Sequence, residues 1–293
     1  MELVVIAVDD DLQGRVALDW LVERARSRPL QVRLVHPLDP DASNPDAAKE
    51  VLALAANRIQ DAAPETQLET VLTHRPLLHD LLEQSVDADL LVIGAHPDPG
   101  IRESRTPSFP VSLAARSRCP VVIVPDDWEP RGGPVIVGVD ASGTALEAAA
   151  FAAREAIAAD RELEIVHTWE PWAGPNTRTD QFEHEGALNA IVERVRAEYP
   201  DALVHGVLRE AVAHNGIIAS ARDASLVVLG THGLGRETGL VLGTIHQEVM
   251  MRGGAPLCIV PLPQAEEAPA QETPAQETPA QETPADEAGS VAE

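Results

Sequence analysis

Three glycines spaced along residues 230–244 make this segment the strongest candidate for chemistry in the sequence. The run reads GTHGLGRETGLVLGT and fits the pattern G-x2-G-x9-G-[ST], with Gly230, Gly233 and Gly243 at the fixed positions. Glycine lets the backbone approach a ligand closely, so that successive N–H groups can bind an anion without a lysine. Thr244 suits the N-cap of a following helix, whose free N–H groups also favour phosphate. The run therefore predicts a phosphate site, and Arg236 can add a positive side chain to it.

A carboxylate at the end of an apolar run is the second candidate. The run from Pro134 to Val139 is followed by Asp140, Ala141 and Ser142. A carboxylate suits a contact to adenine or ribose better than a contact to phosphate, because like charges repel. The sequence therefore predicts a nucleotide site to which Asp140 and Ala141 contribute.

Reactive side chains are scarce in the rest of the chain. Lys49 is the only lysine, so the sequence has no GxxxxGK[ST] phosphate loop. Cys119 and Cys258 cannot by themselves form a disulfide framework or a four-ligand zinc site. No nucleophile–base pair accompanies the glycine loop. We therefore expect the nucleotide to act as a switch or a structural ligand, with slow hydrolysis at most.

The elements that position these residues occur twice in the chain. Residues 3–9 (LVVIAVD) match 134–140 (PVIVGVD), 131 positions later, and residues 89–94 (DLLVIG) match 225–230 (SLVVLG), 136 positions later. Two further matches, of a histidine-containing run and of a PVVIVP-like run, occur in the same order. Because self-similarity at a fixed period identifies repeated units, the chain is a duplicated domain.

Each copy alternates short β-branched runs with longer amphipathic stretches, which indicates an α/β fold. The strand runs are continuously apolar, as in parallel sheets with both faces covered. Five strands per copy predict a five-stranded parallel, doubly wound sheet that binds its ligand where the strand order reverses, at the carboxyl ends of strands one and four. In the second copy we expect strands at about 134–140, 162–168, 202–208, 225–230 and 257–261, and helices at 144–159 and 181–199.

These patterns divide the chain into four parts. We expect a first domain at 1–126, a polar linker at 127–133 and a second domain at 134–263. Residues 264–293 contain three QETPA repeats and almost no branched apolar side chains, so we expect an acidic, disordered tail.

The charge distribution limits the partners. The formal net charge is −25, spread over both domains and the tail, and no basic cluster is evident along the sequence. Nucleic acid and anionic membranes need clustered Lys and Arg, so we expect neither as a partner. No apolar stretch reaches 18 residues and the N-terminal run lacks a signal-peptide pattern, so we expect a cytoplasmic protein.

The glycine loop and the V-D-x-S end of the first strand resemble the ATP-binding members of the universal stress protein family. The resemblance covers nearly all of residues 134–261 and the first copy more loosely. It implies two tandem flavodoxin-like (Rossmann-like) domains, ATP with Mg²⁺ in the second, and pairing of the domains through their last strands. Asp140 and the backbone near Thr168 would hold adenine. Ribose and phosphates would be surrounded by Gly230, His232, Gly233, Gly243, Thr244 and Ile245. One departure is Ser225, where family members usually have Asp.

The first copy departs further from the pattern. Its equivalent loop, residues 94–108, has Pro97 and Pro107 in place of the second and third glycines, and proline fixes φ and removes an N–H. The first strand ends in three aspartates, residues 9–11, whose charge would repel a phosphate. We expect no nucleotide in the first domain. The aspartates suit a turn with helix-capping acids better than a Mg²⁺ site.

Other histidines and tryptophans allow more than one interpretation. His36 and His167 occupy the same repeat position at a strand end, which favours a structural role. His184 shows no metal-ligand spacing and is expected at the surface. Trp169 could stack on a base or pack in the loop after the second strand. Cys258 is expected in the core of the last strand.

Several functions remain open from the sequence alone. The leading interpretation is an ATP-binding regulatory or stress-survival protein. The alternatives are a nucleotide-independent interaction or scaffold module and a slow ATP hydrolase. AMP or a cyclic adenine nucleotide could replace ATP, because the loop reads phosphate more clearly than the number of phosphates. The sheet edges left by internal pairing are compatible with a homodimer.

Overall fold

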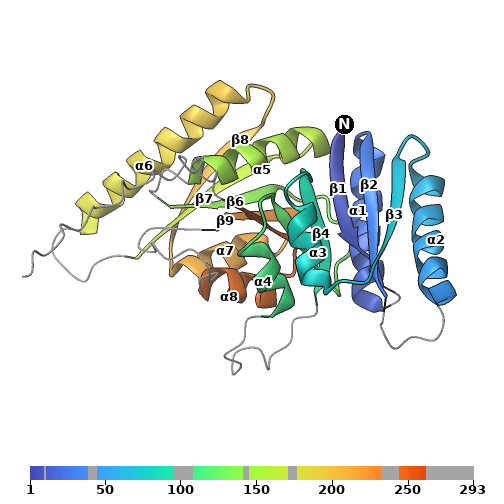
Figure 1. Ribbon diagram of the computed structural model, residues 1–293. Helices are drawn as coiled ribbons and strands as arrows, with labels where there is room; N and C mark the ends of the chain where they lie inside the picture. The colour runs from blue at the N-terminus through green and yellow to red at the C-terminus, as the bar shows by residue number, and fades with distance from the viewer. Residues whose placement is uncertain are drawn as a thin grey trace, which may run out of the picture. The chain divides into compact units, whose positions relative to one another are not determined.

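The computed structural model describes residues 1–9, 11–38, 45–95, 108–140, 145–170, 177–231 and 244–261. Residues 1–262 form one compact unit. The expected disordered tail lies outside the described residues. Within each copy, the described strands and helices alternate along the chain (Figure 1).

Ten strands occur in the described part of the chain: β1 (Glu2–Ala7), β2 (Leu30–Pro37), β3 (Gln67–Thr73), β4 (Leu90–Ala95), β5 (Val121–Pro125), β6 (Val135–Val139), β7 (Leu163–Trp169), β8 (Val204–Glu210), β9 (Leu226–Gly230) and β10 (Leu257–Val260). Eight helices are described: α1 (Leu12–Ser27), α2 (Pro45–Ala62), α3 (Leu77–Gln84), α4 (Phe109–Ala114), α5 (Ala145–Ala159), α6 (Thr177–Glu198), α7 (Ala213–Ala221) and α8 (Thr244–Arg252). The strands expected in the second copy are confirmed to within two residues at each end.

The strands form one sheet with the order β3-β2-β1-β4-β5-β10-β9-β6-β7-β8. Within each copy the neighbours are parallel, and the first strand lies between the second and the fourth. The strand order therefore reverses between β1 and β4, and again between β6 and β9. This strand order, with helices between parallel strands, confirms the predicted α/β, flavodoxin-like fold. Doubly wound sheets bind ligands at the positions where the strand order reverses.

The two copies join through their last strands, β5 and β10, which are antiparallel. Cys258 lies opposite Val122, which occupies the same position in the first copy, 136 residues earlier. Leu257 lies opposite Ile123 and Ile259 opposite Val121, so the register is symmetric about the central pair. This pairing confirms the implied contact through the last strands. It also places a pseudo-twofold axis at the centre of the seam.

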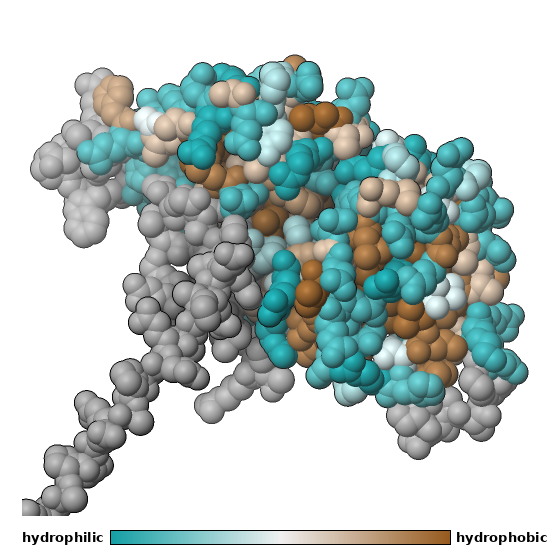
Figure 2. Space-filling model, turned by 45° about the horizontal axis from the view of Figure 1, so that its top comes forward, coloured by the Kyte–Doolittle hydropathy of each residue, from teal (hydrophilic) through white to brown (hydrophobic). Residues whose placement is uncertain are grey.

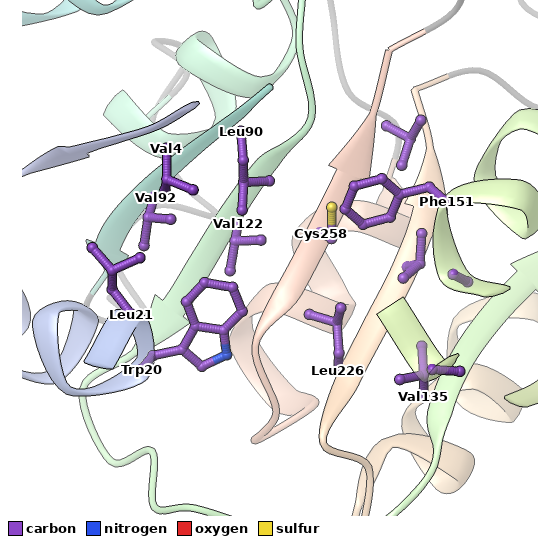
Figure 3. Packing of buried hydrophobic residues seen from close by; sticks show 14 of the residues in the cluster. Val4, Trp20, Leu21, Leu90, Val92, Val122, Val135, Phe151, Leu226 and Cys258 are labelled. Atoms are coloured by element: carbon purple, nitrogen blue, oxygen red, sulfur yellow. The ribbon is translucent and has the colours of Figure 1, made fainter. Parts of the chain in front are cut away.

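Helices cover both faces of the sheet, and strand side chains alternate between the two layers. One core contains residues of α1, α2, α5 and α6, and the other contains residues of α3, α4, α7 and α8. Figure 3 shows the first layer at the seam, where Trp20 of α1 and Phe151 of α5 pack beside Val122 and Cys258. Phe151 is the repeat equivalent of Trp20, so each copy brings one aromatic ring to the seam. Cys258 is fully buried, which confirms its expected place in the core.

The surface is mainly hydrophilic on the face that Figure 2 shows, where hydrophobic residues form small groups. Large exposed apolar side chains lie on separate elements, for example Leu54 on α2 and Phe182 on α6. Such scattered residues are normal for a protein surface. None of the helices in the described ranges has the length and apolarity to cross a bilayer.

Candidate functional site

The candidate site lies at the carboxyl ends of β6 and β9, where the strand order reverses. Asp140 directly follows β6 and is half-buried, and Gly230 is the last residue of β9. The two strands are hydrogen-bonded neighbours, with Val137 opposite Val228, so their ends lie side by side. Parallel pairing thus brings together two of the residues that the sequence singles out.

The remaining predicted residues divide into described and undescribed ones. Thr168, half-buried, is the penultimate residue of β7, which lies beside β6. Thr244 and Ile245 are the first two residues of α8, so the expected helix start near Thr244 is confirmed. The rest of the predicted site lies outside the described residues, namely Ala141, His232, Gly233, Arg236 and Gly243.

His246, which sequence reasoning missed, connects the helix to the strand. Its side chain is buried, and its Nε2 lies 2.8 Å from the carbonyl oxygen of Gly230. Because both ends of the glycine loop are fixed to each other by this contact, α8 begins at a defined distance from the end of β9. The signal that could have found it is the spacing of His246 and Val249, which are three apart and form the buried face of α8.

Histidines also fix the ends of the first and second strands of each copy. His167 Nδ1 lies 2.9 Å from the Val139 carbonyl oxygen, and His36 Nδ1 lies 2.6 Å from that of Val8 in the first copy. The structural role expected for this pair is therefore confirmed. In the second copy, the contact fixes the backbone directly before Asp140.

His184 of α6 extends this arrangement in the second copy. Its Nδ1 lies 2.8 Å from His167 Nε2, and its ring centroid lies 5.6 Å from that of Trp169. The prediction that His184 is a surface residue holds only in part, because its side chain is half-buried and its ring contacts those of His167 and Trp169. Trp169 is only 6% exposed, so it packs in the protein, as one of the two interpretations expected.

A glycine in α7 allows this helix to lie close to the candidate site. A Cβ atom at Gly216 would come within 2.5 Å of the Thr168 side-chain methyl group, so a larger residue would require the helix or the Thr168 side chain to shift. The backbone of Ala211, just before α7, also donates a hydrogen bond to the Trp169 carbonyl oxygen at 3.0 Å. The edge of the site near Thr168 is thus built by close backbone packing.

Ser225, which departs from the family pattern, lies at the opposite end of the strands from the candidate site. In the first copy, Asp89 accepts a hydrogen bond from the Leu3 backbone N–H at 2.7 Å. The equivalent of Leu3 is Pro134, which has no N–H, and there the Ser225 hydroxyl donates to the Pro134 carbonyl oxygen at 3.1 Å. The two substitutions compensate each other locally, far along the strand from Asp140.

The first copy has a different local structure at its equivalent position. Asp11 caps α1, with its carboxylate accepting from the Gly14 N–H at 2.8 Å, so the expected helix-capping acid is confirmed. Asp9 lies against the same turn, since a Cβ at Gly14 would come within 2.1 Å of its carboxylate oxygen. Asp10 and residues 96–107, which include Pro97 and Pro107, lie outside the described residues. In the described ranges, no group of three acidic, histidine or cysteine side chains is arranged to hold a metal.

Comparison with protein families gives two matches along the chain. The sequence profile of the universal stress protein family matches residues 1–125 and again residues 133–261. Both matches span a complete set of five strands. Together they cover most of the chain, including every described residue at the candidate site.

Individual relatives agree with this assignment over almost their whole length. The universal stress protein Rv1996 of Mycobacterium tuberculosis is 25% identical over 308 residues, covering 91% of this chain and 97% of the relative. A universal stress protein crystal structure from Archaeoglobus fulgidus superposes with a TM-score of 0.64 at 19% identity, over 88% of this chain and 98% of that one. A putative universal stress protein from Pseudomonas aeruginosa gives 0.61 at 18%, over 89% and 94%. At these identities the two structures show the fold alone.

Proposed function

The chain belongs to the universal stress protein family, and from this premise we propose that its second domain binds ATP with Mg²⁺ as a cytoplasmic, nucleotide-responsive regulatory or stress-survival protein. The observation that carries the proposal is the reversal of strand order between β6 and β9, where a glycine-rich segment leads directly into α8. Doubly wound sheets bind nucleotides at this position, and helix N-termini favour phosphate.

Each residue of the proposed site has a role that follows from its chemistry. Asp140 accepts hydrogen bonds from adenine or ribose, together with backbone groups at Ala141 and Thr168. The glycines and Ile245 supply backbone close to the phosphates, and the Thr244 hydroxyl and Arg236 donate to phosphate oxygens. We assign Mg²⁺ to the phosphates themselves, which is the usual mode of binding for this ion.

We further propose that only the second domain, residues 134–263, binds nucleotide, and that the first, residues 1–126, serves as its scaffold and pairing partner across the linker 127–133. Two features support this proposed difference in nucleotide binding between the domains. The helix α4 of the first domain has six residues and carries Pro110 in its first turn, against nine residues in α8. Asp11 follows the first strand where the second domain has Ser142, so it adds negative charge beside the expected phosphates, and a unit like charge near 4 Å costs about 4 kcal/mol at an effective dielectric constant of 20.

Replacing equivalent aspartates in the two domains tests the assignment. Displacement of a fluorescent ATP analogue by Mg·ATP would be measured on the full chain, on Asp140→Ala and on the matched control Asp9→Ala. Because a hydrogen bond to a charged group contributes about 1.5–3 kcal/mol, we expect Asp140→Ala to weaken binding about 10- to 100-fold. The control should bind like the parent chain.

Other outcomes would replace this function with a specific alternative. Equal weakening by both substitutions would contradict the one-site arrangement. Preference for AMP or a cyclic adenine nucleotide over ATP would keep the site and change its ligand. Failure to bind any adenine nucleotide would instead favour an interaction or scaffold module.

A further inference from the structure

A cavity of about 340 Å³ lies at the opposite end of the strands from the candidate nucleotide site. It is lined by the first residues of two strands, Val135 of β6 and Leu226 of β9, and by the C-terminal turns of α1. Trp128 and Arg131, in the segment that joins the two domains, form another wall. Its volume is in the range of about 300–1,000 Å³ that is typical of small-molecule sites.

Arginine dominates the charged lining of this cavity. Two glutamates, Glu23 and Glu155, also line it. The arginines are Arg24, Arg26, Arg28, Arg131 and Arg161. The whole chain carries only 22 Lys and Arg residues and a net charge of −25, so such a concentration of positive charge is unusual for this molecule.

Three of these arginines are paired with carboxylates. Arg24 forms ion pairs with Glu155 and Glu2, and Arg28 forms a 3.2 Å contact with Glu155. Arg26 pairs with Glu23 on the exposed side of α1. These pairs account for the glutamates of the lining, so they leave no lining carboxylate for the other arginines.

Arg131 and Arg161 make only backbone contacts in the described part of the chain. Arg131 donates to the Arg222 carbonyl oxygen at 2.8 Å, and Arg161 donates to that of Gly132 at 3.0 Å. A guanidinium has five N–H donors in a planar fork that suits phosphate and carboxylate oxygens. Among the residues that the structure describes, neither arginine therefore has an ion-pair partner, and most N–H donors of each make no contact with the protein.

The buried wall of the cavity also has unsatisfied donors. The Nε atoms of Arg24 and Arg28 are buried and have no hydrogen-bond partner within the described ranges, and Arg24 as a whole is only 6% exposed. A buried donor without a partner is costly unless a water or ligand satisfies it.

Two indole rings supply the apolar part of the lining. Trp20 is 7% exposed and lies with the Arg24 guanidinium carbon 5.6 Å from its ring centroid. In Figure 3 it points from α1 toward the strands of the second domain, with Leu226 and Val135 on the far side. Trp128 contributes the second ring and is half-buried. Indole faces and guanidinium planes both stack on flat ligands.

We propose that this cavity is a second ligand site, which binds a small aromatic dianion whose phosphate or comparable group contacts Arg131 and Arg161 while its ring lies against Trp20 and Trp128. An aryl phosphate is the simplest example of this class. The site uses residues of both domains and of the segment between them, and it is independent of the nucleotide site, because it lies at the other ends of the same strands.

Tryptophan fluorescence tests the proposal, since two of the four tryptophans line the cavity. Phenyl phosphate would be titrated into the full chain, into Arg131→Gln/Arg161→Gln and into the control Arg116→Gln/Arg118→Gln. The control removes two exposed arginines of the first domain, outside the cavity, so the change in net charge is the same. We expect saturable quenching with one site per chain, an affinity lowered about tenfold or more in the cavity variant, and no change in the control. Trp128→Phe should reduce the amplitude of the quenching.

Further titrations distinguish this site from other sources of binding. Saturating Mg·ATP, or the variant Gly233→Pro, should leave the affinity for phenyl phosphate unchanged. Inorganic phosphate and phenol, each with half of the ligand, should bind at least about tenfold more weakly. Absence of saturable quenching, equal affinity in both arginine variants, or competition by Mg·ATP would overturn the proposal. Because both substituted arginines are at least partly exposed and glutamine keeps a donor for each carbonyl, the cavity variant should remain folded, which thermal unfolding checks.

Discussion

Position 225 illustrates, at the scale of single residues, how a repeat changes without losing a contact. Asp89 and Ser225 occupy the same place before the fourth strand of each copy, and both anchor the start of the neighbouring first strand. The residue they contact decides which side chain fits: an acceptor for the Leu3 N–H, and a donor for the Pro134 carbonyl oxygen. Ser225 is therefore explained by Pro134 rather than by nucleotide binding.

A double-mutant cycle at this pair gives the first prediction. Ser225→Asp should lower the free energy of unfolding by about 1–2 kcal/mol, because the carboxylate would face a carbonyl oxygen without an N–H to accept from. Adding Pro134→Leu restores an N–H and should recover at least about 1 kcal/mol, a coupling typical of residues in contact. Urea unfolding of the two single variants and the double variant measures this. Simple additivity would contradict the explanation.

The two cysteines give a second prediction at this scale. Burial raises the pKa of the Cys119 thiol to about 11, despite a hydrogen bond with Ser117, and burial also raises the pKa of Cys258. The thiolate is the reactive form, so at pH 8 only about one Cys119 in a thousand is reactive. Ellman's reagent should therefore detect no thiol in the folded chain and two after unfolding. Rapid labelling of the folded chain, assigned with Cys119→Ser, would contradict the burial.

At the scale of elements, helices α1 and α5 meet across the seam with opposite charges at equivalent positions. Arg24 and Glu155 are 131 residues apart, which is the repeat spacing, and they form a buried ion pair. In a symmetric dimer of identical domains, this position would face itself with like charges. A tandem chain can instead carry Arg in one copy and Glu in the other. The pair thus favours pairing of the first domain with the second.

The protonation states of this pair follow from two opposing effects. Burial by itself would raise the pKa of Glu155 and lower that of Arg24. Coulomb attraction and hydrogen bonds between the two outweigh burial, so the pKa of Glu155 lies below its usual value and that of Arg24 lies above its own. Both groups are therefore charged at neutral pH.

Replacing Glu155 gives the third prediction. Glu155→Gln leaves the buried Arg24 without its main counter-charge and should cost about 3–5 kcal/mol at pH 7. Since the folded-state pKa of Glu155 is lowered, its contribution is fully present above the ordinary value of about 4.5 and is lost as the pH falls through the folded-state pKa. The difference between parent and variant should therefore be constant from pH 7 to 5 and shrink in more acidic solution.

The exposed pair Arg26–Glu23 provides the control for this measurement. Glu23→Gln breaks an ion pair whose side chains are about half exposed, so it should cost at most about 1 kcal/mol. Chemical unfolding at several pH values compares the two variants. A cost for Glu155→Gln as small as that of Glu23→Gln, or one independent of pH, would contradict the role given to the buried pair.

The sequence predicts elements better than it predicts contacts between them. Helix α5 was expected at 144–159 and is Ala145–Ala159, because alanine-rich amphipathic periodicity depends only on neighbouring residues. Helix α6 was expected at 181–199 and begins earlier, at Thr177, where polar residues give no hydrophobic period. The Arg24–Glu155 pair, the His167–His184 contact and the arginine cavity were not predicted. Each joins residues far apart in the chain, and their positions depend on how the sheet is assembled.

At the candidate site, too, the sequence predicts the elements but not the contacts between them. Strand ends and the start of α8 follow from local patterns, so Asp140, Gly230 and Thr244 could be assigned to one edge of the sheet. The contact from His246 to Gly230 could not be predicted, because the sequence does not indicate which carbonyl oxygen a histidine on a buried helix face will contact. The predicted binding roles of the loop residues stay predictions.

At the scale of the whole molecule, the two domains share a fold, and we propose that they differ in what they bind. Residues 1–262 are one compact unit whose sheet runs through both copies. The symmetric seam relates the two switch points, yet the acidic strand end and short α4 of the first copy contrast with the glycine loop and longer α8 of the second. We expect one nucleotide per chain, with the first domain as its structural partner.

Calorimetric titration of Mg·ATP tests this asymmetry most directly. The full chain would be compared with Gly233→Pro, which fixes φ and removes an N–H in the second loop, and with Gly100→Pro, the same substitution in the first loop. We predict one site per chain at about micromolar affinity, near −8 kcal/mol, lost in Gly233→Pro and retained in Gly100→Pro. Two sites per chain, or one site lost only in Gly100→Pro, would contradict the account.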